Sequence, residues 1–226
     1  MQLDHLVLAA RTLADGVAWC EATLGIVPAP GGTHAFMGTH NRLFSIGSAA
    51  FPRAYFEIIA IDPAAPTPAR PRWFDLDEAA LQRALANGPR LIHWVARCDD
   101  VAADVLTLRA AGIDRGEVLQ AERATPQGML RWQITLRGDG QRLFGGALPA
   151  LIQWGEVHPT DTLPPSGVAL SQVTLRGLPA SVVPMLPASV RAEPGAAGPA
   201  LSVTLSTARG PVSLHSIEPE TDDVQR

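Results

Sequence analysis

The chain has 226 residues, of which 46% are hydrophobic and 18% charged, and its formal net charge is −4. These values are typical of a soluble globular protein with a full core, and they argue against nucleic acid or an anionic membrane surface as the main partner. All basic residues are arginine, so Schiff-base chemistry and attachment of pyridoxal phosphate to a lysine are excluded.

The first 61 residues are predicted to form a module of one strand, one helix and three further strands (βαβββ). The segment LDHLVL at residues 3–8 has the aliphatic and β-branched composition of a strand. A helical pattern follows, with Thr12 as its N-cap and Gly25 at its C-terminal end. Three short apolar runs, the last at residues 54–61, are bounded by glycine, proline or charged residues, which indicates three strands.

Residues 62–90 are predicted to connect this module to a second copy of it. The connector begins with a stretch rich in proline, alanine and arginine and continues into a short helix that ends at Gly88. Its length and proline content favour a lid that controls access to a site. Residues 91–160 then repeat the first module, because LIHWVA at 91–96 matches LDHLVL and a helix opened by Asp99 is followed by three strands.

Residues 161–226 are predicted to form a degenerate third copy. Gln172 stands where the first two copies have a histidine, and three prolines between residues 179 and 187 limit any helix to a turn or two. Residues 201–217 have the pattern of a closing hairpin. The repeats therefore predict an α+β fold of paired βαβββ modules with a cleft between them, followed by a degenerate half-module.

Two histidines occupy the same position in the two modules. Because side chains alternate along a strand, His5 and His93 are expected to point to the same face of the sheet. Glu57 is a carboxylate inside the last strand of the first module, and Gln153 is taken as its counterpart in the second. Two imidazoles, a carboxylate and an amide form a ligand set for a divalent metal that leaves positions open for water or substrate.

The residues also resemble a known family. The segments DHLVLAA, FEIIAID, LIHWVA and LIQWGEVHP are similar to the vicinal oxygen chelate superfamily and its glyoxalase-like branch, over about residues 1–160. The resemblance implies that the modules form curved sheets that pair into a cup, with a metal at its floor that chelates two substrate oxygens. It assigns His5, Glu57 and His93 as metal ligands. Gln153 departs from the glutamate usual in the family, which leaves metal binding and the catalytic base open.

Other residues are candidates for contact with a substrate. His40, Asn41 and Arg42 are expected to line the mouth of the cup and hold an anionic or carbonyl group, or else to be solvated turn residues. Gln153 either donates to a substrate oxygen or makes a structural hydrogen bond. The tryptophans concentrated in the second module form either an apolar wall of the cup or part of the core: Trp94, Trp132 and Trp154.

For four further residues a structural interpretation is preferred to a functional one. His34 is interpreted as a solvated turn residue, and His158, which could approach the opening of the cup, as a loop histidine. Cys20 and Cys98 are too few for a disulfide framework and lie in no Cys-x-x-Cys motif, so both are expected to be buried thiols. The start of the chain does not have the pattern of a signal peptide, and no stretch is as long as a membrane span, so a cytoplasmic location is expected.

Two functions remain open. One is a metal-dependent lyase, isomerase or dioxygenase for a small oxygen-rich substrate, with Zn, Ni, Mn or Fe as the metal and Glu57 as ligand or catalytic base. The other is a metal-free protein that binds or sequesters a small molecule in the same cup. The chain contains neither the GxSxG motif of hydrolases nor a Rossmann or P-loop glycine pattern. One chain can build the cup alone, and exposed sheet edges leave a homodimer open.

Overall fold

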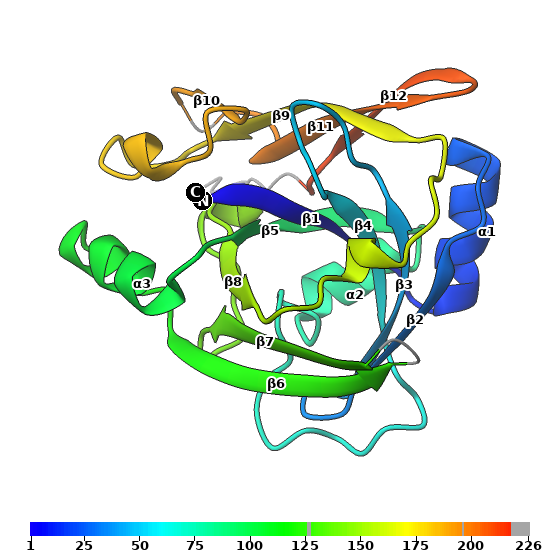
Figure 1. Ribbon diagram of the computed structural model, residues 1–226, viewed down its shortest axis with the longest axis horizontal. Helices are drawn as coiled ribbons and strands as arrows, with labels where there is room; N and C mark the ends of the chain where they lie inside the picture. Colours follow the sequence, from blue (N-terminus) through cyan, green and yellow to red (C-terminus); the bar gives the residue numbers. More distant parts are fainter. Residues whose placement is uncertain (126–127, 196, 218–226) are drawn as a thin grey trace, which may run out of the picture.

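The computed structural model describes residues 1–125, 128–195 and 197–217. Within these ranges the strands form an eight-stranded sheet and a four-stranded sheet (Figure 1). The first module contains β1 (Gln2–Ala9), α1 (Leu13–Leu24), β2 (Ala29–His34), β3 (Thr39–Ser45) and β4 (Tyr55–Ile61). The connector contains α2 (Ala79–Leu85), and the second module contains β5 (Arg90–Arg97), α3 (Val101–Ala110), β6 (Glu117–Thr125), β7 (Gly128–Leu136) and β8 (Ala150–Trp154).

The two predicted modules form the two halves of the large sheet. The strand order is β2-β3-β4-β1 in the first half and β5-β8-β7-β6 in the second, and β1 pairs antiparallel with β5 at the centre. In each half the first strand of the module pairs in parallel with the last. The sheet curls into a half-barrel, which Figure 1 shows most clearly where β6 and β7 curve beneath the central strands. This confirms the fold of paired βαβββ modules.

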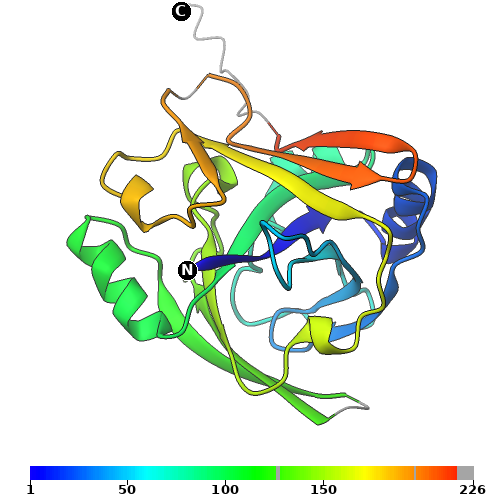
Figure 2. The same cartoon turned by 45° about the horizontal axis from the view of Figure 1, so that its top comes forward.

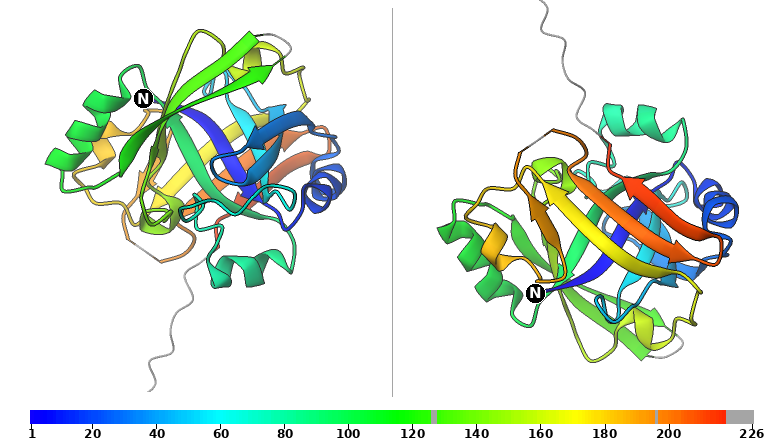
Figure 3. Two further views of the ribbon diagram at one scale, coloured as in Figure 1. Left: turned by 90° about the horizontal axis from the view of Figure 1, so that it is seen from below. Right: turned by 90° about the horizontal axis from the view of Figure 1, so that it is seen from above.

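Each face of the curled sheet has its own hydrophobic core. The outer face packs against α1, α3 and the C-terminal sheet, and includes Leu6, Phe56 and Trp94. The inner, concave face is covered by the connector, whose Trp73 and Phe74 pack against apolar side chains of both modules. Figure 3 shows the C-terminal sheet lying across β1 and β5, between α1 and α3.

The C-terminal residues build the second sheet, which Figure 2 shows in yellow to red above the central strands. Its strands are β9 (Ala169–Arg176), β10 (Arg191–Glu193), β11 (Leu201–Thr207) and β12 (Gly210–His215). The proline-rich segment forms only a short 3-10 turn, Val183–Met185, as expected, and β11 and β12 form the expected hairpin. The strand order β10-β9-β11-β12 differs from that of the modules, since the first strand here lies inside the sheet.

Two bulges interrupt the central β1–β5 ladder at related places. In β1, Leu3 pairs with Ala96 and His5 with Val95, so Asp4 is an extra residue. In β5, Ile92 is likewise the extra residue that precedes His93. A bulge interrupts the alternation of side chains and allows consecutive residues to reach one side of a sheet. In the first module the bulge allows the Asp4 side chain to reach His5.

Helix ends and the connector follow local rules. Thr12 caps α1 by accepting a hydrogen bond from the Asp15 N–H at 3.1 Å, and Gly25 ends it with φ of 73°, both as predicted. The N-cap of α3 is Asp100 rather than the expected Asp99, because the Asp100 side chain accepts the Ala103 N–H at 3.0 Å. In the described part of the chain, every helix is too short or too polar to cross a membrane.

Candidate functional site

The concave face of the sheet contains a small buried space beside β1, β3 and β4, which we call the inner cavity. Its volume is about 40 Å³, room for a few water molecules. A second space of about 410 Å³, the outer hollow, adjoins it and shares four lining residues with it, Arg123 among them. The polar and titratable side chains that line the inner cavity include His5, His34, Asn41, Tyr55, Glu57 and Arg123.

His5 lines the inner cavity, and Asp4 lies directly behind it. Asp4 is completely buried, with Oδ1 2.7 Å from His5 Nδ1, while Oδ2 accepts hydrogen bonds from His158 Nε2 at 2.9 Å and Trp154 Nε1 at 3.0 Å. Burial by itself would raise the pKa of Asp4, but the hydrogen bonds from His158 and His5 outweigh burial and hold this pKa well below its usual range. The carboxylate therefore accepts the Nδ1 proton, and a neutral His5 carries its lone pair on Nε2.

Glu57 lines the inner cavity close to His5, and its position is fixed by a hydrogen bond from Asn41. Its Oε2 is 3.7 Å from His5 Nε2, and its Oε1 accepts a hydrogen bond from Asn41 Nδ2 at 2.6 Å. Asn41 Oδ1 in turn accepts the backbone N–H of Gly32 at 2.7 Å, which sets the orientation of the amide. Gly31 is required for this approach, because a Cβ there would lie 2.1 Å from Asn41 Oδ1 and 2.5 Å from the Asn41 carbonyl oxygen.

Two further cavity residues stay uncharged near neutral pH. Burial, together with the positive charge of Arg123, lowers the pKa of His34 to about 3. Burial and the nearby carboxylates Asp4 and Glu57 raise the pKa of Tyr55 well above its usual value, and its ring stacks on His5 at a centroid distance of 4.5 Å. Neither His34 nor Tyr55 therefore contributes a charge to the inner cavity.

His5 and Glu57 together have the geometry of an acid–base pair. Two proton acceptors that face one cavity at 3.7 Å can hold one proton between them, so that one group accepts a proton from a ligand while the other donates one. Each acceptor is held by a buried partner, His5 by Asp4 and Glu57 by Asn41. This arrangement is suited to proton transfer at a carbon or oxygen atom of a small ligand.

The second module does not reproduce this pair. His93 is fully buried, its Nδ1 lies 3.3 Å from the Gly146 carbonyl oxygen, and its Nε2 accepts the Ala150 N–H at 3.1 Å. Burial, with the charges of nearby arginines, lowers the pKa of His93 well below its usual value. The ring of Phe74 from the connector packs against it at 5.0 Å. His93 therefore has a structural role in this conformation.

Strand register shows why the two halves differ. Val7, two residues after His5, pairs with Glu57, and Val95, two residues after His93, pairs with Ala150. The register counterpart of Glu57 is therefore Ala150 rather than Gln153. Ile92 similarly stands where the first module has Asp4. The second module therefore has a histidine equivalent to His5 but apolar residues at the positions of Asp4 and Glu57.

The predicted metal ligands do not fit a three-ligand centre. Both ring nitrogens of His93 are used in hydrogen bonds within the protein, so His93 has no lone pair for a metal. Across the described ranges of the chain, no group of three His, Cys, Asp or Glu side chains is arranged to hold a metal ion. His5 and Glu57 remain together at the inner cavity without the third ligand.

The structure places the predicted substrate residues of β3 on both faces of the sheet. Asn41 lines the inner cavity, whereas His40 and Arg42 do not line it, since neighbouring residues of a strand point to opposite faces. His40 Nδ1 instead lies 4.0 Å from Asp62 Oδ1. Three consecutive strand residues cannot all line one cup, so Asn41 alone remains a candidate.

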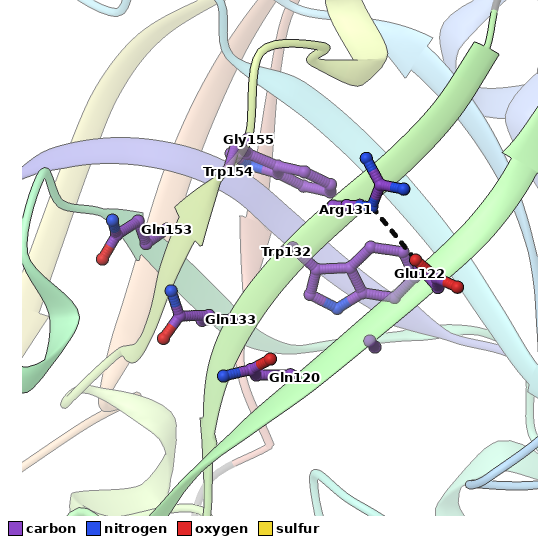
Figure 4. A pocket seen from close by; sticks show the side chains of 9 residues that line it. Gln120, Glu122, Arg131, Trp132, Gln133, Gln153, Trp154 and Gly155 are labelled. Atoms are coloured by element: carbon purple, nitrogen blue, oxygen red, sulfur yellow. Dashed lines mark hydrogen bonds and ion pairs between the residues drawn. The ribbon is translucent and has the colours of Figure 1, made fainter.

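The predicted residues of the second module divide in the same way. Trp94 is buried in the outer-face core and donates to the Ala147 carbonyl oxygen at 2.8 Å. Trp154 lines the inner cavity, whereas Gln153 lies on the other face of β8 and accepts the Val101 N–H at the start of α3. Figure 4 shows this division, with Gln133 and Gln153 on one side of their strands and the paired Trp132 and Trp154 on the other.

Several site residues lacked a clear sequence signal. Asp4 directly precedes His5, but strict alternation would place it on the opposite face, and only the bulge brings the two side chains together. His34 was expected to be a solvated turn residue, yet it is buried and lines the cavity. His158 lies outside the strands, as expected of a loop histidine, but it is buried and hydrogen-bonded to Asp4. Arg123 comes from a distant strand.

The expectation for the cysteines agrees with the structure: both are free and buried, and burial raises the pKa of each thiol to about 12.

Comparison with known proteins supports the fold and the family. The chain matches the family described as glyoxalase-like domain over residues 3–186.

Among solved structures, the chain is similar to a protein described as hypothetical from Staphylococcus aureus. The two are 15% identical, the alignment covers 95% of this chain and 85% of that chain, and the TM-score is 0.54. Methylmalonyl-CoA epimerases from Streptomyces coelicolor and Mycobacterium tuberculosis show 21% and 17% identity, with TM-scores of 0.42 and 0.39. The alignments cover 70% and 71% of this chain and 97% and 91% of theirs. No curated protein matches the chain. The match over most of its length shows that the chain belongs to the glyoxalase-like domain family.

Proposed function

We propose that this protein is an acid–base enzyme, an isomerase or lyase, that moves a proton on a small carbonyl compound by means of His5 and Glu57. The observation that carries the proposal is the buried array Asp4–His5–Glu57, in which His5 Nδ1 is 2.7 Å from Asp4 and His5 Nε2 is 3.7 Å from Glu57. The full burial of Asp4 beside His5 distinguishes this array from a histidine exposed on the protein surface. A histidine and a carboxylate that face one cavity, each held by a buried hydrogen-bond partner, are typical of acid–base sites.

The roles follow from the hydrogen bonds. Asp4 keeps the proton of neutral His5 on Nδ1, so that Nε2 is free to accept a proton. Asn41 occupies one oxygen of Glu57 and leaves the other directed toward His5. When one of the two bases removes a proton from a carbon next to a carbonyl group, the electron pair of the C–H bond moves into the carbonyl to form an enolate. Return of a proton to that carbon gives isomerisation, and loss of a leaving group from the neighbouring carbon gives elimination.

Hydrogen–deuterium exchange tests this proposal without knowledge of the natural substrate. Small carbonyl compounds are incubated in D₂O with the protein, and loss of the C–H signal is followed by proton NMR. We expect exchange with the wild type, and a decrease of about 10²–10⁴-fold in Glu57→Gln and in His5→Gln. Glu122→Gln is the matched control, because Glu122 is an exposed carboxylate that pairs only with Arg131 in the described structure.

The assay also separates the alternatives. Exchange that survives a chelator supports acid–base chemistry by the protein's own groups, whereas exchange that requires added Zn²⁺, Ni²⁺, Mn²⁺ or Fe²⁺ would contradict the proposal in its present form. Binding of a carbonyl compound without exchange would favour the sequestering function instead. Equal exchange by wild type and both site variants would overturn the assignment of His5 and Glu57.

A further inference from the structure

Two N–H donors of residues that line the inner cavity have no acceptor in the described part of the protein. They are Nη1 of Arg123 and Nε1 of Trp73, and both atoms are inaccessible to solvent. Trp73 is 3% exposed and lies against His34, with a ring distance of 4.9 Å. Buried polar groups without partners are uncommon, so two of them beside one cavity point to an acceptor that comes from outside the chain.

Arg123 is also without a carboxylate partner among the described residues, which sets it apart from Arg131 on the paired strand β7. Its guanidinium lies close against Gly32 of β2, where a Cβ would be only 2.1 Å from Nη1. A glycine at this position therefore makes room for the guanidinium at the cavity wall. Arg123 lines both the inner cavity and the outer hollow, and so stands where a ligand would pass from one to the other.

We infer that Arg123 and Trp73 bind the carboxylate of an anionic substrate, and that the substrate class is a short carboxylic acid that carries a carbonyl group. A guanidinium presents paired N–H donors that match the two oxygens of a carboxylate, and the indole supplies a further donor. The inner cavity has room for little more than a carboxylate and the adjacent carbon, so any longer part of the ligand would extend into the outer hollow.

The inference deepens the proposed function and rests on it, because the carboxylate would bring its neighbouring carbon to His5 and Glu57. Asp4 and Glu57 make this region acidic, so an anion needs a compensating cation close by. In the described cavity lining Arg123 is the one arginine, and it supplies that charge. Neutral carbonyl compounds would lack this contact and are expected to bind more weakly.

The test uses the tryptophan side chains as reporters. In ¹⁵N-labelled protein the five tryptophans give separate indole N–H signals, and the signal missing in Trp73→Phe identifies Trp73. Sodium formate, acetate and pyruvate are titrated against the neutral amides of the same acids, with sodium chloride at equal ionic strength. We expect the Trp73 signal to shift with the carboxylates and to respond little to the amides or to chloride.

Variants then locate the contact. Arg123→Gln should weaken carboxylate binding at least about tenfold, and Trp73→Phe, followed by calorimetry, should weaken it several-fold. Arg131→Gln is the matched control, because its side chain is 67% exposed and paired with Glu122, and it should bind like the wild type. Absence of binding to the wild type, equal binding of amides or chloride, or unchanged affinity in Arg123→Gln would each overturn the inference.

The same titration on Glu57→Gln keeps this inference separate from the proposed function. Carboxylate binding retained in Glu57→Gln, with no hydrogen exchange in the wild type, would refute the catalytic proposal and leave the anion site standing. Exchange of neutral carbonyl compounds that is insensitive to Arg123→Gln would refute the anion site and leave the catalytic proposal standing.

Discussion

Replacement of Asp4 by asparagine tests whether the buried array behind the inner cavity is held together by charge. The side chain is completely buried and is hydrogen-bonded to His5, His158 and Trp154 at 2.7, 2.9 and 3.0 Å. Asparagine has nearly the same shape and can keep its oxygen toward His158 and Trp154. Its NH₂ group would then face His5 Nδ1, which must become an acceptor and move its proton to Nε2.

The expected loss of stability follows from these three bonds. A hydrogen bond to a charged group contributes about 1.5–3 kcal/mol and a neutral one about 0.5–1.5 kcal/mol, so removal of the charge costs about 1 kcal/mol per bond. For Asp4→Asn we therefore expect the free energy of unfolding to decrease by about 3 kcal/mol. In a chain of this size this corresponds to a melting temperature lower by about 6–12 °C.

The effect on stability should depend on pH. The pKa of Asp4 is lowered in the folded protein, so its carboxylate contributes stability above the unfolded pKa near 3.9, and this contribution is lost as the pH falls toward the folded value. The difference between wild type and Asp4→Asn should be largest near pH 7 and should narrow below about pH 4. In the variant His5 carries its proton on Nε2, which can then no longer accept a proton from a ligand. Hydrogen exchange activity should therefore also fall by about 10²–10⁴-fold.

Urea unfolding at several pH values measures the difference directly. Asp139→Asn is the control, because Asp139 is a partly exposed carboxylate paired with Arg137 and its loss should cost no more than about 1 kcal/mol. A difference below about 1 kcal/mol for Asp4→Asn at pH 7 would refute the reasoning. A difference that stays constant down to pH 3 would also refute it, since the carboxylate could not then be its cause.

Two further changes test the structural roles assigned above. His93→Ala removes the ring that is hydrogen-bonded to two backbone groups and leaves a cavity, so the free energy of unfolding should decrease by roughly 3–5 kcal/mol. The metal content measured by elemental mass spectrometry should be the same in His93→Ala and the wild type. A lower metal content in the variant would show that His93 is a metal ligand. Asp75→Asn weakens the contact between the connector and Arg142, where Asp75 Oδ2 lies 2.8 Å from Nε, while asparagine still tolerates the φ of 60° found there. Limited proteolysis of residues 62–78 should become several-fold faster, and an unchanged cleavage rate would show that this ion pair does not hold the connector in the cup.

The fold could be predicted because its signals are local. The helix that begins after Thr12 and ends at Gly25, the alternating strands and the repeat of LDHLVL as LIHWVA each depend on a few neighbouring residues. A duplicated pattern then predicts duplicated structure, which the two halves of the large sheet confirm. His5 and Glu57 were identified in the same way, as polar residues inside otherwise apolar strands.

Other residues could not be assigned from the sequence because their positions depend on register. Gln153 matches Glu57 approximately in a comparison of apolar runs, but the pairing of β5 with β8 makes Ala150 the equivalent residue. Arg42 follows Asn41 directly, and alternation along β3 places the two on opposite faces. A shift of one residue reverses the face of a strand, so sequence spacing alone does not assign a side chain to the cavity.

The amino-acid sequence by itself determined the two modules, the connector between them and the histidines that they share. Only the tertiary structure decided that one module brings Asp4, His5 and Glu57 together, because a bulge turns Asp4 toward His5 and strand register brings Glu57 beside it. It also decided that Trp73 from the connector and Arg123 from β6 line the same cavity. Local sequence patterns specify strands and helices, whereas contacts between distant residues depend on how those elements pair and curl in space.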